Sequence, residues 1–167
     1  MTPGNPAMMN RKRVRVFGRR DVLLGAGAAA FVVAFLKTAP AADANKKSDE
    51  FQAALKALLG EAKPVSGGIE MDLPDAVENG DYVPLSLSLE SPMTEENHVK
   101  AIHLLSTANP RADVATYRFT LLSGKARVIS RMRLAMTQEV IAVAELSNGT
   151  FLMSGHTVDV KIGGCGI

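Results

Sequence analysis

The feature that most limits the fold of this chain is an apolar–polar alternation with a period of two residues, which begins near Ile69. In the segment VPLSLSLE, Leu85, Leu87 and Leu89 alternate with serines and a glutamate, as in a strand that buries one face. Further candidate strands are the segments VKAIHLLS, TYRFTLL, ARVISRMRL, EVIAVAEL, TFLMS and HTVDVKI. The alternation predicts a mainly β domain.

Short turn signals separate these segments and set the expected architecture. They lie at 78–81, 109–110, 123–124, 147–149 and 154–155 and are rich in Gly, Asn, Pro and Ser. About seven short strands in roughly 100 residues predict an immunoglobulin-like antiparallel β-sandwich over residues 63–162. The chain has one cysteine and no tryptophan, so neither an inter-sheet disulfide nor a core Trp supports the sandwich, and a small barrel stays open as an alternative.

An amphipathic helix is expected before the strands, within residues 45–62. In SDEFQAALKALLG, Ser48 is placed to cap the helix and acidic residues occupy the first turn. Apolar residues then follow at helical spacing up to a terminating glycine: Phe51, Leu55, Leu58, Leu59 and Gly60. This stripe predicts a helix that packs one face on the domain.

The first 44 residues have the organisation of an export signal. A basic segment, RKRVRVFGRR, precedes the uncharged apolar run Val22–Leu36, and small residues offer cleavage after Ala41 or Ala44. The pair Arg19-Arg20 before the apolar run resembles a twin-arginine signal, so we expect export to the periplasm. A retained membrane anchor is the alternative, although the run is shorter than the roughly 20 residues that cross a bilayer.

Cleavage also changes the charge of the protein. After Ala44 the chain carries 12 Lys and Arg against 15 Asp and Glu, a net charge of −3. The basic character of the full sequence therefore belongs to the signal, and the remaining chain offers no basic surface typical of nucleic-acid binding.

The chain ends in GGCGI, which places its single cysteine, Cys165, among Gly163, Gly164 and Gly166. Because glycines offer no side chain to bury, residues 163–167 are expected to form a flexible arm. Prenylation requires three residues after the cysteine, and only two follow. Burial as a structural cysteine, an intermolecular disulfide and a thiol presented for chemistry remain as interpretations of Cys165.

The sequence gives Cys165 no neighbour that would activate it. A thiol with an ordinary pKa of about 8.5 is only a few per cent thiolate at neutral pH. We therefore expect no catalysis by this domain alone, and interpret the thiol as a handle that partner enzymes activate. His98, His103 and His156 fall in separate segments, so neither a metal site nor a cofactor is expected.

The sequence resembles the SoxY family of the periplasmic thiosulfate-oxidation (Sox) system over nearly the whole exported chain. The resemblance is carried by MDLPDAVENGDYVPLSLSLESPMTEENHVKAIHLL, by NPRADVATYRFTLLSGKARVISRMRLAMTQEVIAVAELSNGTF and by the terminal VDVKIGGCG. It implies an immunoglobulin-like fold and a non-catalytic carrier that binds sulfur intermediates covalently on Cys165. Gly163, Gly164 and Gly166 would then give the arm its flexibility.

The same resemblance implies partners. They are SoxZ, as the second subunit of a heterodimer, a haem enzyme that couples thiosulfate to the thiol, a hydrolase that releases sulfate and, in many organisms, a sulfane dehydrogenase. Ile167 departs from the family's usual terminal glycine, which limits how far this partner list transfers.

Two other hypotheses stay open: a thiol-redox protein, and an interaction module whose Cys165 only crosslinks subunits. The sequence does not assign the SoxZ contact surface, and exposed apolar strand faces within Leu85–Leu105 are candidates for it by burial logic only.

Overall fold

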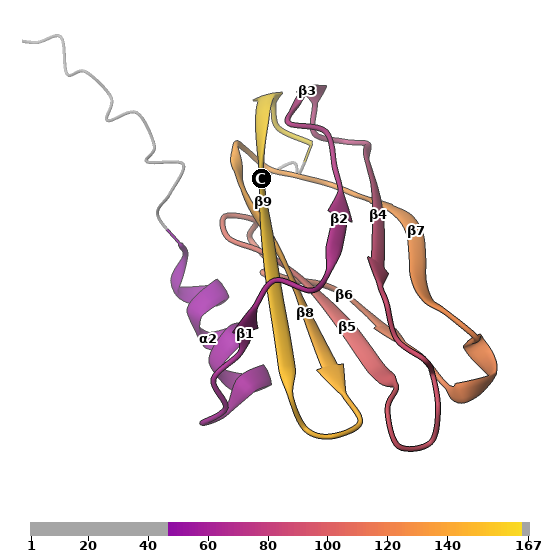
Figure 1. The fold of residues 1–167 in the computed structure, drawn as a ribbon. Helices are drawn as coiled ribbons and strands as arrows, with labels where there is room; N and C mark the ends of the chain where they lie inside the picture. The colour runs from indigo at the N-terminus through magenta and orange to yellow at the C-terminus, as the bar shows by residue number, and fades with distance from the viewer. Residues whose placement is uncertain (1–46, 165–167) are drawn as a thin grey trace, which may run out of the picture. The chain divides into compact units, whose positions relative to one another are not determined.

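The computed structural model describes residues 47–164, which contain one α-helix and nine strands. The strands form two packed sheets. This confirms the predicted immunoglobulin-like sandwich and its N-terminal helix, and the two layers are visible in Figure 1. The predicted signal, with Arg19 and Arg20, lies outside the described residues, as do Cys165, Gly166 and Ile167.

The larger sheet has the strand order β1-β9-β8-β5-β6, and the smaller sheet has the order β2-β4-β7. Two short strands, β1 and β3, run parallel to different parts of β9, whereas the other pairs are antiparallel. The strands are β1 (Val65–Ser66), β2 (Glu70–Asp72), β3 (Ala76–Asn79), β4 (Val83–Leu89), β5 (Val99–Ser106), β6 (Asp113–Arg118), β7 (Ala126–Met132), β8 (Gln138–Leu146) and β9 (Phe151–Ile162).

The core lies between the two sheets and follows the alternation seen in the sequence. Leu85, Leu87 and Leu89 of β4 are buried against β5, β8 and β9 of the opposite sheet. Strand β8 buries both of its faces: Val140, Ala142 and Ala144 enter this core, whereas Ile141 and Val143 face the helix. Burial on both sides explains why β8 is a continuous apolar run, VIAVA, and does not alternate.

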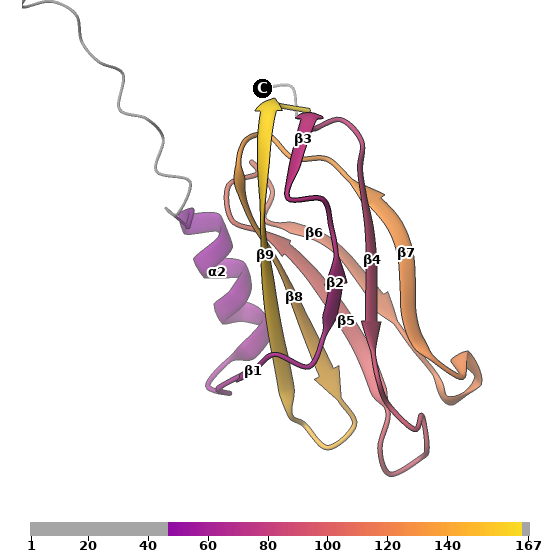
Figure 2. The same cartoon turned by 45° about the horizontal axis from the view of Figure 1, so that its top comes forward.

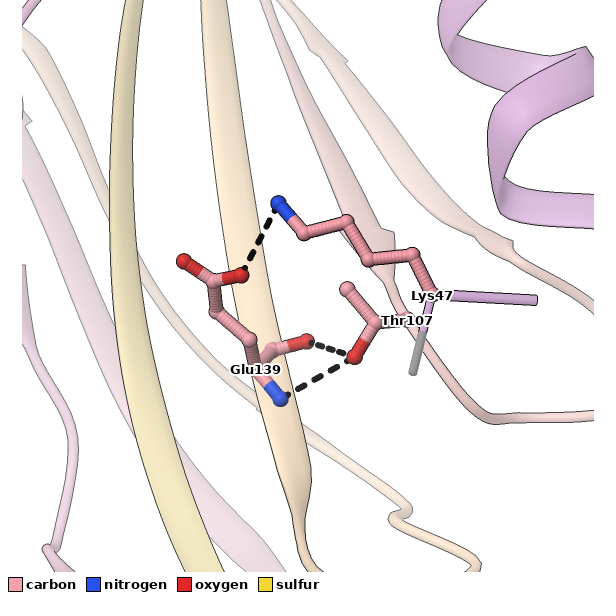
Figure 3. Close-up of polar contacts among 3 residues, drawn as sticks. All are labelled: Lys47, Thr107 and Glu139. Atoms are coloured by element: carbon pink, nitrogen blue, oxygen red, sulfur yellow. Dashed lines mark hydrogen bonds and ion pairs between the residues drawn. The ribbon is translucent and has the colours of Figure 1, made fainter. Parts of the chain in front are cut away.

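Helix α2 (Asp49–Leu59) covers the outer face of the larger sheet (Figures 1 and 2). The Ser48 side chain accepts a hydrogen bond from the Phe51 backbone N–H at 3.2 Å, so Ser48 is the predicted N-cap. Phe51 is fully buried among residues of β5 and β8. Figure 3 shows the polar contacts beside this start: Lys47 Nζ lies 3.1 Å from Glu139 Oε2, and the Thr107 hydroxyl bonds the Glu139 backbone.

Three details of the sequence interpretation are wrong. The predicted turn at 154–155 does not exist, because β9 runs unbroken and Gly155 pairs with Ile141 of β8. A Cβ at Gly155 would lie 2.5 Å from Glu139 Oε1, so this glycine admits a close side chain and does not turn the chain. Leu121 and Leu122, predicted at the end of a strand, belong to the short 3₁₀ helix η2 (Leu121–Ser123).

The third error is the expectation of exposed apolar strand faces within Leu85–Leu105. The large apolar side chains of Leu85–Leu105 are not exposed, because the sandwich core and the helix-side cluster bury them. The exposed apolar side chains of residues 47–164 lie elsewhere and include Tyr82 and Ile129 on the smaller sheet's side of the domain.

Candidate functional site

The candidate site is the end of the sandwich at which β9 stops and the chain continues to Cys165. Here β3 runs parallel to β9, with Asn79 opposite Ile162. The Gly80 N–H, just after β3, donates to the Ile162 carbonyl oxygen at 2.8 Å. Figure 2 shows the ends of β3 and β9 side by side at this end of the domain.

Backbone hydrogen bonds join the residues after β9 to two loops that are distant in sequence. The Gly164 N–H donates to the Leu134 carbonyl oxygen at 2.8 Å, and the Leu134 N–H donates to the Gly80 carbonyl oxygen at 2.9 Å. Leu134 is fully buried, and Gly164 is buried as well. We call the group formed by Gly80, Leu134, Ala135, Gly163 and Gly164 the tail anchor.

Three glycines of the tail anchor occupy positions with no room for a side chain. A Cβ at Gly80 would lie 2.2 Å from the Leu134 carbonyl oxygen, and one at Gly163 would lie 2.1 Å from the Ala135 carbonyl oxygen. A Cβ at Gly164 would lie 2.0 Å from the Asp81 backbone nitrogen. The atoms in the way are backbone atoms, which cannot rotate aside as a side chain can. None of the three glycines has a positive φ, so close approach and not left-handed geometry requires glycine here.

A buried polar network supports the loop that carries Leu134 and Ala135. The Asn109 side-chain oxygen accepts from the Ala135 N–H at 2.9 Å and from Gln138 Nε2 at 2.7 Å, while Asn109 Nδ2 donates to the Arg133 carbonyl oxygen at 2.9 Å. Both side chains are buried. Because each polar group of Asn109 has a partner, the network fixes the loop conformation.

The surface beside the tail anchor is an open hollow of about 540 Å³ lined by Asp81, Tyr82, Arg131, Met132 and Arg133. The Arg131 guanidinium lies over the Tyr82 ring, 5.3 Å from its centre. Within residues 47–164 neither Arg131 nor Arg133 forms an ion pair. Two guanidinium groups without an ion-pair partner among residues 47–164 therefore stand beside the point where the described chain ends.

The three histidines lie apart from one another and from the tail anchor. His98 Nδ1 is 2.9 Å from the Thr94 carbonyl oxygen, and His103 Nδ1 is 3.1 Å from Thr116 Oγ1 across β5 and β6. Burial lowers the pKa of His103. His156 Nε2 is 3.3 Å from Asp75 Oδ1 but lacks the alignment of a hydrogen bond.

Two further features are absent from residues 47–164. No three His, Cys, Asp or Glu side chains there gather as metal ligands. No helix in the same range has the length and apolar character to cross a membrane.

Of the predicted site residues, the structure describes Gly163 and Gly164 and places both in the tail anchor. The residues that meet them, Gly80, Leu134 and Ala135, were not identified from the sequence. The sequence indicates only a turn at Gly80, because its partners Leu134 and Ile162 lie more than fifty residues away along the chain. Glycines at 163 and 164 were a usable signal of close backbone approach, but flexibility was the simpler explanation for them.

The two sheets and the outer helix define this domain as an immunoglobulin-like β-sandwich whose C-terminal segment is bound at one end. A family model described as "Sulfur oxidation protein SoxY" matches residues 55–165, about two thirds of the chain, and its match ends at Cys165. The chain belongs to the SoxY family.

One solved structure agrees with this assignment, and a second shares the fold. The sulfur carrier protein SoxY from Chlorobium limicola f thiosulfatophilum is similar, with a TM-score of 0.57 and 25% identity over 68% of this chain and 97% of that one. A superoxide reductase (neelaredoxin) from Ignicoccus hospitalis has a TM-score of 0.52 and 12% identity over 56% of this chain and 80% of that one. The second likeness shows the fold alone. No curated protein sequence matches the chain.

Proposed function

We propose that this chain is a non-catalytic carrier that holds sulfur-oxidation intermediates covalently on the thiol of Cys165 and presents them to successive Sox enzymes. The observation that carries the proposal is the match to the SoxY family, which extends to Cys165, the single cysteine of the sequence. The similar protein from Chlorobium limicola is a sulfur carrier, which supports the same role here.

The proposed chemistry needs only one thiol on the carrier. In the first step the Cys165 thiol loses its proton and bonds to the terminal sulfur of thiosulfate, giving Cys165–S–S–SO₃⁻. This bond formation releases two electrons, which a haem enzyme of the system accepts. In the second step a hydrolase adds water at the sulfonate sulfur, and the S–SO₃ bond breaks. Sulfate and two protons leave, and a persulfide, Cys165–S–S⁻, stays on the carrier.

Covalent attachment explains why a carrier would serve this chemistry. An intermediate bound to Cys165 cannot diffuse away between enzymes, so each later step proceeds as if intramolecular. We propose SoxZ as the partner subunit, with the haem enzyme, the sulfate-releasing hydrolase and a sulfane dehydrogenase as visiting enzymes. We further propose export to the periplasm by the twin-arginine route, through Arg19 and Arg20.

Substitution of the thiol tests this proposal against its alternatives. Cys165→Ser is expected to abolish thiosulfate-dependent electron transfer to the haem partner while SoxZ binding, measured by size-exclusion chromatography, stays unchanged. If Cys165 only crosslinks subunits, the variant will lose a covalent dimer and keep thiosulfate oxidation. If the chain is a thiol-redox protein, the wild type will turn over peroxide or a disulfide without Sox partners.

A further inference from the structure

We propose that the tail anchor fixes the start of the C-terminal arm, so that the arm pivots after Gly164 and not after Ile162. Gly80 is then the positioning residue that determines where Cys165 is presented. The inference rests on the proposed function only in giving Cys165 a partner to meet. The anchor itself follows from contacts among described residues, and it assigns two of the arm's glycines to packing.

The first support is a set of three backbone hydrogen bonds that link the three segments of the anchor to one another. Gly80 donates to Ile162, Leu134 donates to Gly80, and Gly164 donates to Leu134, at 2.8, 2.9 and 2.8 Å. Each bond joins a different pair of segments, so the β9 end cannot leave without breaking two of the three. Cooperative contacts of this kind hold a chain end that would otherwise fray.

The second support is that the packing leaves no space for any other residue type. Cβ atoms at positions 80, 163 and 164 would each come within 2.2 Å of a backbone atom. If these glycines served flexibility alone, there would be no reason for backbone atoms of other loops to lie so close. The glycine at position 80 is on a separate loop, where arm flexibility does not apply.

The third support is the buried side chain behind the anchor. Leu134 is fully buried in the sandwich core, and Asn109 holds the next residue, Ala135, through its backbone N–H. The acceptor of the Gly164 hydrogen bond is therefore fixed by the core itself. The tail anchor is therefore coupled to the sandwich core.

The pivot sets how far the thiol can travel. Consecutive Cα atoms are about 3.8 Å apart, so from a pivot at Gly164 the Cα of Cys165 stays within about 3.8 Å of the anchored chain. Release from Ile162 would add two residues and extend the reach to about 10 Å. With the anchor closed, a partner enzyme must approach the loops around Asp81 and Arg133 to reach the thiol.

Two glycines of the arm provide a matched test. Gly164→Ala places a methyl group against the Gly80–Asp81 backbone, whereas Gly166→Ala makes the same chemical change two residues further along, outside the anchor. Amide hydrogen exchange, followed by NMR on the exported chain, reports the hydrogen bond at position 164. We expect exchange at that amide to rise at least about tenfold in Gly164→Ala and to stay at the wild-type rate in Gly166→Ala. Exchange in β5 and β8 should not change in either variant.

Gly80→Ala opens the same anchor from the other side, and its Cβ would meet the Leu134 carbonyl oxygen. It should accelerate exchange at both 134 and 164. Gly155→Ala on β9 is its control, because the added Cβ meets only the end of the flexible Glu139 side chain. If Gly80→Ala fails to fold, Gly164→Ala still decides the question, because strain at position 164 can be relieved by releasing only the residues after Ile162.

A functional readout separates positioning from a merely structural role. Gly164→Ala is expected to slow sulfur loading by the haem partner several-fold, while alkylation of Cys165 by iodoacetamide, which needs no docking, keeps its rate. Equal effects of Gly164→Ala and Gly166→Ala on exchange, or an unprotected amide at Gly164 in the wild type, would overturn the anchor. The exchange result does not depend on sulfur chemistry, so the carrier role and the anchor are tested independently.

Discussion

The sandwich core and the tail anchor hold the same domain together by opposite means. In the core, large side chains such as Leu87 and Ile102 fill the space between the sheets, and their volume stabilises the fold. In the anchor, three glycines have no side chain and backbone meets backbone. The core therefore tolerates no loss of volume, and the anchor tolerates no gain of it.

The largest effect we expect is in the core and should leave the arm untouched. Leu87→Ala removes a fully buried side chain of β4 and is expected to lower the free energy of unfolding by about 2–5 kcal/mol, measured by urea denaturation. Leu122→Ala is the control, because Leu122 is 98% exposed and should change stability by less than about 0.5 kcal/mol. Under strongly native conditions, sulfur loading on Cys165 should be the same in both variants. Selective loss of loading in Leu87→Ala would show that the two regions are not independent.

A smaller effect is expected where the two regions meet. Asn109→Ala leaves the Ala135 N–H, Gln138 Nε2 and the Arg133 carbonyl without their side-chain partner. Because these groups are partly or fully buried, we expect the free energy of unfolding to fall by about 2–3 kcal/mol and amide exchange at Gly164 to become faster. Asn148→Ala, which removes a single exposed bond to the Thr150 N–H, should leave exchange at Gly164 unchanged. A destabilised Asn109→Ala with normal exchange at Gly164 would show that the loop does not hold the anchor.

The charge beside the anchor should have a modest effect on rate. Arg131 and Arg133 line the hollow next to Gly164, so they should attract an anionic reagent to Cys165. We expect the double variant Arg131→Gln/Arg133→Gln to lower the ratio of iodoacetate to iodoacetamide alkylation rates by about two- to threefold at low salt. The control Lys125→Gln/Arg127→Gln removes equal charge at the far end of β7. Equal ratios in the two double variants would place the thiol away from the hollow.

The smallest effect is a pH dependence confined to the sandwich. Burial lowers the pKa of His103; Glu145 and Asp113 oppose this shift, and Arg118 adds to it. The folded pKa therefore lies below the unfolded value of about 6.5, and the unfolded chain binds the proton more readily. Stability should fall as pH decreases below about 6.5, and His103→Gln should flatten that slope. Identical slopes in urea denaturation of the variant and wild type between about pH 7 and 5 would contradict it.

The sequence predicted the core far better than the anchor, for a physical reason. Alternation in β4 and the Ser48–Gly60 helix signals are local patterns, since each side chain's face follows from its position in one segment. The sequence does not predict a continuous β9, because Ser154-Gly155 has the composition of a turn. Gly155 instead makes room for the Glu139 side chain of another strand. The anchor depends on backbone distances among positions 80, 134 and 164, which no local pattern encodes. The role of Cys165 stays a prediction, which rests on its being the single cysteine of the sequence and on the resemblance to the family motif.

The most direct test of the central claim is the intact mass of the exported protein, isolated from cells grown on thiosulfate, before and after treatment with a reductant. We predict reductant-labile additions of sulfur or of an S₂O₃ unit, confined to the terminal peptide that contains Cys165. The same spectrum reports whether the signal ends at Ala41 or Ala44. A bare thiol or a plain disulfide-linked dimer during thiosulfate oxidation, with all partners present, would contradict the carrier role.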